Sequence, residues 1–186
     1  MIGQPWFFKG AVVVTLLTLL VWLVMLVVTT PYLGALSGGL AIFDLRPGGY
    51  DLEDARALVS RLGMTGVDYY LGTQQRLDSI FPLLVAATIS AWLMINGFRL
   101  KEAGVAGMMT ATTLFSLLSM IGAIIDYSEN GAIRMILMTP PDSLTAEAVA
   151  RASAMTQLKF LASGLAFAAL LGMLAMRILR QRPNRA

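Results

Sequence analysis

The sequence predicts an all-α integral membrane protein, a four-helix bundle with short helices in its two outer (periplasmic) segments. Hydrophobic residues make up 57% of the 186 residues and charged residues only 13%, which is well outside the composition of soluble globular domains. The apolar residues gather in four long runs, and ~20 apolar residues suffice for a helix to cross a hydrocarbon core about 30 Å thick. A chain of this length is normally one domain, so residues 1–186 should form a single membrane domain.

The absence of two residue types excludes several classes of catalytic and metal-binding site. The chain contains no cysteine and no histidine. Disulfides, thiol nucleophiles and thiolate metal sites are therefore excluded, as are imidazole-ligated haem or zinc and the Ser-His-Asp triad. No nucleophile and base are spaced for catalysis, and nothing predicts a cofactor, a metal site or a nucleic-acid partner. The sequence therefore favours a non-catalytic protein.

The first apolar run predicts a span over about residues 10–29. A secretory signal peptide is the alternative, with an apolar region of ~7–15 residues, a basic start and a small-residue cleavage site. The uncharged run from Ala11 to Val28 is longer than that, and only Lys9 precedes it as a basic residue. A retained transmembrane helix is therefore expected.

The first outer segment covers residues 30–78 and should contain a short amphipathic helix. A turn at residues 46–49 precedes Asp51, which can cap the helix, and Gly63 stands where a helix would end. The apolar positions between them form one stripe, made of Ala55, Leu58, Val59 and Leu62. This helix can pack on the bundle, lie in the membrane interface or bind a partner. Its mixed charges favour packing on the bundle.

The second span is predicted over about residues 79–97. A helix should begin near Thr65 or Gly66 and lead into it, with Pro82 either kinking the helix or marking its entry into lipid. A connection as short as residues 97–102 makes the second and third spans antiparallel neighbours.

The third and fourth spans are predicted over about residues 103–125 and 159–177, separated by the second outer segment, residues 126–158. Small residues recur every four positions in both spans, at Ala103, Gly107 and Ala111 and at Gly164, Ala168 and Gly172. Such faces let helices approach closely in lipid. We expect them to be packing faces within this bundle, with homodimerisation as the alternative. A helix starting near Ser143 can run unbroken into the fourth span.

Basic residues set the predicted orientation. Both termini and the connection at 97–102 lie on one side, which carries Lys9, Arg99 and Lys101 against the single acid Glu102. Because basic residues close to spans favour the cytoplasm, both termini should be cytoplasmic. The same side carries the basic tail, made of Arg177, Arg180, Arg182 and Arg185. This tail either anchors the topology or binds anionic lipid headgroups.

Polar residues at the outer ends of the spans are predicted to converge. Counting at ~1.5 Å per residue places them at a similar depth, near the outer hydrocarbon boundary. The candidate cluster consists of Asp78, Asp126, Glu129, Asn130, Thr156 and Lys159. In the structural interpretation, Lys159 pairs with Asp126 or Asp78 and fixes the helix register. In the functional interpretation, the ionisable groups form a site for a headgroup, an ion or a small substrate.

Short motifs distributed over most of the chain carry a resemblance. They are Gly49-Tyr50-Asp51, Leu62-Gly63, Gly66, Tyr70, Leu77-Asp78 and Phe81-Pro82, followed by Asp126, Glu129-Asn130 and the stretch 156–159. The pattern resembles small bacterial four-span inner-membrane proteins of uncharacterised function. The resemblance implies a multi-pass protein of the bacterial cytoplasmic membrane and implies no activity.

Two functions are expected from these observations. The first is a non-catalytic accessory or scaffold protein with a membrane-protein partner. The second is a lipid- or small-molecule-binding membrane protein, or an enzyme, that uses the polar cluster at the outer interface.

Overall fold

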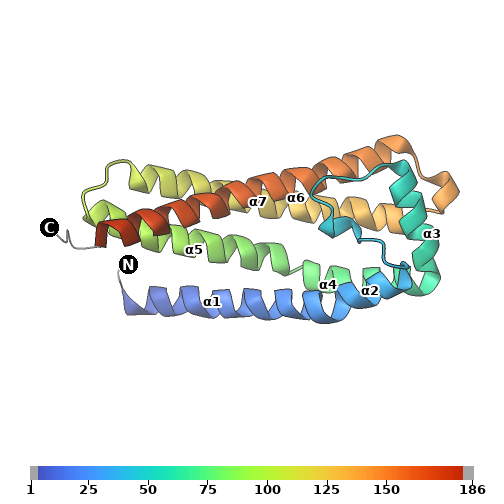
Figure 1. The fold of residues 1–186 in the computed structure, drawn as a ribbon, viewed down its shortest axis with the longest axis horizontal. Coiled ribbons are helices and arrows are strands. Elements are labelled where there is room, and N and C mark those ends of the chain that lie inside the picture. The colour runs from blue at the N-terminus through green and yellow to red at the C-terminus, as the bar shows by residue number, and fades with distance from the viewer. Residues whose placement is uncertain (1–3, 182–186) are drawn as a thin grey trace.

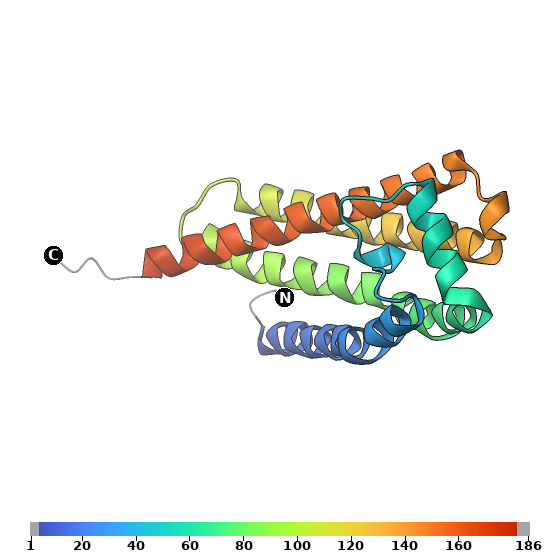
Figure 2. The same cartoon turned by 45° about the vertical axis from the view of Figure 1, so that its right-hand side comes forward.

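Every regular element in the computed structural model, which describes residues 4–181, is helical. Four helical segments are long and apolar enough to cross a membrane: Pro5–Leu36, Leu52–Glu102, Met108–Met138 and Ala146–Arg180. Their longest helices run side by side along the long axis, whereas residues 52–69 of the second segment lie across one end (Figure 1). The start of the first and the end of the last lie at the same end of the molecule, here called the termini end (Figure 2). The predicted all-α protein with four apolar spans is confirmed.

Three of the long helices form the centre of the bundle. Helices α5 (Phe81–Glu102), α6 (Met108–Met138) and α7 (Ala146–Gln181) each pack against the other two. Helix α1 (Pro5–Val24) lies at the side and packs chiefly on α5. Two hydrogen bonds between side chains join it to α5: the Thr18 and Thr88 hydroxyls are 2.8 Å apart, and Trp92 Nε1 donates to Thr15 Oγ1 over 2.9 Å. The Thr18 hydroxyl also lies 3.1 Å from the Leu84 carbonyl oxygen. Most of the surface of α1 is therefore apolar and exposed.

The first outer segment crosses the end of the bundle opposite the termini. A π-helical turn, Met25–Thr29, joins α1 to α2 (Thr30–Leu36), and a 3₁₀ turn, Phe43–Leu45, follows. Helix α3 (Leu52–Tyr69) begins at Asp51, whose carboxylate accepts the Asp54 amide over 2.9 Å. The predicted stripe is buried against the bundle, as the mixed charges favoured.

The second spanning segment is interrupted three times before it enters the bundle. The chain bends at Gly63, whose φ of 57° suits glycine. A π-helical turn, Tyr70–Gln74, leads into α4 (Gln75–Asp78), and Ser79 and Ile80 then separate α4 from α5. Pro82 stands in the first turn of α5, where proline is tolerated, and so marks the start of that helix.

The helix ends differ from the predicted spans. Helix α5 continues to Glu102, the connection occupies residues 103–107, and α6 then runs without a break to Met138. Residues 126–130, which were predicted to follow the third span in the second outer segment, therefore lie inside the same helix as that span. Helix α7 is continuous from Ala146, as the alanine-rich stretch indicated.

The predicted packing face of small residues is wrong in the fourth span, and in the third span only Ala111, which is half-buried, packs against the core. Gly164, Ala168 and Gly172 are exposed, and a Cβ atom built on either glycine meets nothing within 4 Å. Ala103 and Gly107 are exposed in the connection between α5 and α6. Helix α7 faces its neighbours through a different stripe, Ala162, Ala166, Leu170 and Met173. Two other glycines of the long helices lie tightly against a neighbouring helix, Gly97 against Thr112 and Gly122 against Ser163.

Candidate functional site

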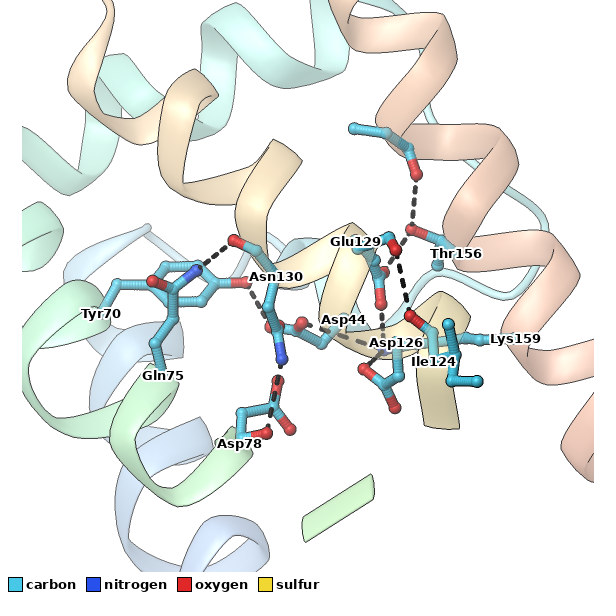
Figure 3. A network of polar contacts seen from close by, with 12 residues as sticks. Asp44, Tyr70, Gln75, Asp78, Ile124, Asp126, Glu129, Asn130, Thr156 and Lys159 are labelled. Atoms are coloured by element: carbon cyan, nitrogen blue, oxygen red, sulfur yellow. Dashed lines mark hydrogen bonds and ion pairs between the residues drawn. The ribbon is translucent and has the colours of Figure 1, made fainter. Parts of the chain in front are cut away.

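Four carboxyl groups and one lysine meet in the half of the bundle opposite the termini end (Figure 3). Asp44 comes from the 3₁₀ turn, Asp78 from the end of α4, Asp126 and Glu129 from α6, and Lys159 from α7. Asp44, Asp78, Glu129 and Lys159 are buried and Asp126 is half-buried. The structure thus brings together all the ionisable residues that the sequence singled out, and adds Asp44.

Lys159 is the centre of this carboxylate cluster. Its Nζ atom lies 3.1 Å from Asp126 Oδ1, contacts Glu129 Oε2 directly and lies 4.0 Å from Asp44 Oδ1. The expected pair with Asp126 is present, whereas no ion pair joins Lys159 to Asp78 within residues 4–181. One ammonium group is therefore shared among three carboxylates from two separate elements.

Thr156 and Glu129 link α7 to α6 beside the lysine. Thr156 stands one helical turn before Lys159, and its hydroxyl donates to Glu129 Oε1 over 2.5 Å. Both side chains have 0% exposure. Thr156 and Lys159, on one face of α7, thus each contact one oxygen of the Glu129 carboxylate. These contacts fix the register between α6 and α7.

Asp44 enters the cluster from a segment that lacks helical periodicity. Tyr70, in the second π-helical turn, donates its hydroxyl to Asp44 Oδ2 over 2.5 Å. Tyr50 lies nearby, and burial raises the pKa of its hydroxyl, with Glu129 and Asp44 adding to the effect. The hydroxyl therefore stays protonated at neutral pH. The sequence offered no sign that residues 43–50 fold back into the bundle.

Asn130 and Tyr127 cover the break between α4 and α5. Asn130 Nδ2 donates to the carbonyl oxygen of Asp78 over 3.4 Å, and the Tyr127 hydroxyl donates to that of Ser79 over 3.1 Å. Gln75 Nε2 in turn donates to the Asn130 carbonyl over 2.9 Å. Asn130 thus satisfies a carbonyl at the end of α4 and makes no hydrogen bond to the Asp78 carboxylate.

Two π-helical turns lie beside the cluster and are joined to each other. Thr29, at the end of the first, donates its hydroxyl to Gln74 Oε1, at the end of the second, over 2.5 Å. Both side chains are 1% exposed. Departures from α-helical geometry of this kind occur frequently at functional sites.

The character of the surface changes at the level of the cluster. On α7, exposed apolar residues extend from Leu179 back to Leu158, and polar residues such as Gln157 and Arg151 are exposed beyond that point. On α6, the exposed apolar Ile124 is followed by the exposed Tyr127 and Ser128, and exposed apolar residues return only at Met135 and Met138 near the helix end. An apolar belt therefore borders the cluster on the side of the termini.

The cluster holds more negative than positive groups, and several of its acceptors lack a partner. Five buried atoms in or beside it form no hydrogen bond within the described part of the chain: Asp44 Oδ1, Tyr50 Oη, Asp78 Oδ2, Glu129 Oε2 and Asn130 Oδ1. Of these, Asp44 Oδ1 and Glu129 Oε2 are ion-pair partners of Lys159, which leaves the Tyr50, Asp78 and Asn130 oxygens without any partner. Buried polar groups are normally satisfied, so each such atom calls for an explanation. Across residues 4–181, no three Asp or Glu side chains are arranged to hold a metal ion. The geometry instead suits groups that donate several hydrogen bonds and carry positive charge.

No protein family, curated protein or solved structure matches the chain. Function is therefore inferred from the geometry of the cluster.

Proposed function

We propose that this chain is a non-catalytic integral membrane protein that binds a molecule carrying a protonated amine in the carboxylate cluster. The observation that carries this proposal is the charge imbalance: four carboxyl groups from three elements share the cluster with the single ammonium group of Lys159, which pairs with three of them.

A purely structural network would be expected to balance its charges. Removing an ionised carboxylate from water costs several kcal/mol unless a partner compensates it. Lys159 compensates for one negative charge, which leaves the cluster up to three charges in excess. Ionisable groups in membrane segments are by default candidates for function. A bound cationic group would supply the missing positive charge.

The unpartnered atoms define what the ligand has to offer. An alkylammonium group has three N–H donors and no acceptor. Asp78 Oδ2 and Asp44 Oδ1 can accept hydrogen bonds from it. The oxygen of the protonated Tyr50 hydroxyl can accept one as well. The Lys159 ammonium group, already surrounded by carboxylates, is the internal example of such binding.

The local backbone supports a binding role. Asp78 ends α4 beside the non-helical residues Ser79 and Ile80, and two π-helical turns lie close by. Interrupted helices at membrane depth commonly form the binding sites of membrane proteins, because the freed backbone groups and helix ends face the ligand. Contacts that only fix the register of the helices would not need two π-helical turns and a break at Ser79 and Ile80.

The proposed setting follows from the sequence. The protein would lie in the bacterial cytoplasmic membrane with both termini in the cytoplasm, which would place the cluster near the outer interface. The change from apolar to polar surface beside Lys159 supports this depth. An amphiphile with an amine headgroup would reach the cluster laterally, past the half-buried Asp126.

Replacing Asp78 by asparagine is expected to weaken amine binding by about tenfold or more, since charged hydrogen bonds contribute ~1.5–3 kcal/mol. Octylamine serves as the probe, and octanol as a neutral probe of the same length. Purified protein in detergent should gain thermal stability with octylamine and not with octanol, and Asp78→Asn should lose that gain.

The control for this substitution is Asp68→Asn, which makes the same chemical change at an exposed position of α3. It should keep the response of the unmodified protein. Equal stabilisation by octylamine in Asp78→Asn and Asp68→Asn, or equal stabilisation by octanol, would contradict the proposal.

A second candidate function is an accessory subunit, and the exposed face Gly164, Ala168 and Gly172 favours it. Small residues at four-residue spacing allow close helix contact in lipid, and this chain does not use them internally. Purification in mild detergent should then recover a stoichiometric membrane partner, and Gly164→Leu should release it. A protein that purifies alone in both forms would argue against this role.

A further inference from the structure

A cavity of about 480 Å³ lies at the termini end, between the start of α1 and the end of α5. The start of α1 and the end of α5 lie together here because the two helices run in opposite directions (Figure 1). The carboxylate cluster lies in the other half of the molecule. Lys9 and Phe8 line the cavity from α1, and Arg99 and Phe98 line it from α5. The cavity thus combines two cationic side chains with two aromatic rings.

The two cations of this cavity have no partner among the described residues. Neither Lys9 nor Arg99 forms a side-chain hydrogen bond or an ion pair within residues 4–181, although Glu102 lines the same cavity. With Glu102 counted, the three ionisable side chains carry a net charge of +1. Lys101, next in the chain, adds a further exposed positive charge close by.

The arginines at the end of α7 are engaged differently. Arg177 Nη1 donates to Asn96 Oδ1 over 2.9 Å, and Arg180 Nη1 donates to the Ala103 carbonyl over 3.3 Å. These contacts fasten α7 to the end of α5. Arg182 and Arg185, the other two members of the predicted lipid-binding tail, lie outside the described residues. Lys9 and Arg99, in contrast, line the cavity between α1 and α5.

The start of α1 adds to the positive potential. The helix has 20 residues, begins at Pro5 and carries no acidic residue in its first turn. Its N-cap, Gln4, lines the cavity and makes no capping hydrogen bond through its side chain. The free amides and the dipole of a helix N-terminus favour an anion nearby.

The apolar part of the cavity suits a lipid better than a soluble anion. Ile95 lies beside the two phenylalanines in the lining. The Phe8 ring is fixed edge-on against Trp92, with 5.6 Å between the ring centroids. The cavity opens at the start of α1, whose outer surface is apolar and exposed, so an acyl chain could continue along that helix.

We propose that this cavity binds the headgroup of an anionic phospholipid from the leaflet at the termini end. Lys9 and Arg99 contact the phosphate, and Phe8 and Phe98 contact the first carbons of the acyl chains. The proposal does not depend on the amine site, which lies in the other half of the molecule.

Native mass spectrometry of the full chain, released from neutral detergent, tests this directly. Phosphatidylglycerol should bind more tightly than phosphatidylcholine, which has the same acyl chains and phosphate but no net charge. Lys9→Gln and Arg99→Gln should each weaken phosphatidylglycerol binding about fivefold, as expected for one basic residue near a charged headgroup. Lys101→Gln removes the same charge from a neighbouring exposed position outside the cavity lining, and should have a smaller effect.

Three outcomes would overturn the proposal. Equal binding of the two lipids would show that charge does not select the ligand. Equal losses in Lys101→Gln and Arg99→Gln would show diffuse attraction without a site. Displacement of phosphatidylglycerol by millimolar inorganic phosphate would identify a soluble anion as the occupant. The lipid comparison uses the unmodified protein, so it holds even if a variant folds poorly.

Discussion

Replacing Lys159 by methionine is expected to lower the free energy of unfolding by about 3–5 kcal/mol, the range for breaking a buried ion pair by removing one partner. Lys159 contacts Asp126 and Glu129 and lies 4.0 Å from Asp44. Methionine keeps most of the volume but leaves these carboxylates with no cation. Unfolding of the purified protein in mixed micelles of mild detergent and SDS measures the change.

A paired substitution shows whether the effect comes from charge. Glu129→Gln removes the carboxylate that contacts Lys159 most closely, and its amide can still accept the Thr156 hydroxyl. The double variant Lys159→Met/Glu129→Gln should therefore recover part of the lost stability. Lys101→Met, at an exposed position, should change stability by less than about 0.5 kcal/mol. A loss for Lys159→Met as small as that of Lys101→Met would contradict the central role of Lys159.

The meeting of Asp78, Asp126, Glu129 and Lys159 could be predicted because helices have a fixed rise per residue. Once four apolar runs are assigned to antiparallel helices, counting residues from a common end places these side chains at one depth. Asp78, Glu129 and Lys159 are also buried and Asp126 is half-buried, so these side chains face the interior of the bundle. Periodicity along a helix was sufficient for this part of the site.

Asp44 could not be predicted in the same way. It lies in a short 3₁₀ turn within an irregular stretch, and its place beside Lys159 depends on how residues 37–51 fold back onto the bundle. Its hydrogen-bond partner, Tyr70, belongs to a π-helical turn, which leaves no mark in the apolar pattern. Both features are set by tertiary packing.

The packing faces were mispredicted for a reason specific to membranes. In water, the buried face of a helix is the apolar one, so the sequence identifies it. In lipid, the faces toward neighbours and toward acyl chains are both apolar, and a glycine fits either. Gly164 and Gly172 face outward, whereas Gly97, which belongs to no small-residue repeat, lies at the tightest contact.

Replacing Gly97 by leucine is expected to be among the most destabilising single changes in the bundle. Gly97 is buried in α5, and even a Cβ atom there would collide with the Thr112 hydroxyl and lie 3.1 Å from its Cβ atom. Three further carbon atoms cannot be placed without separating α5 from α6. Overpacking of this kind commonly costs 1–3 kcal/mol and occasionally more, so a loss of about 3 kcal/mol or greater is expected in the same unfolding titration.

Gly164→Leu is the matched control, since it makes the same substitution within a spanning helix where a Cβ atom meets nothing within 4 Å. Leucine is also a better helix former than glycine by roughly 0.8 kcal/mol, so the isolated chain should keep or slightly gain stability. An equal loss of unfolding free energy in Gly97→Leu and Gly164→Leu would mean that helix α7 packs through its small-residue face, which would contradict the structure. A stable Gly164→Leu protein that has lost a membrane partner would instead assign that exposed face to an interface, because the substitution blocks close approach without disturbing the fold.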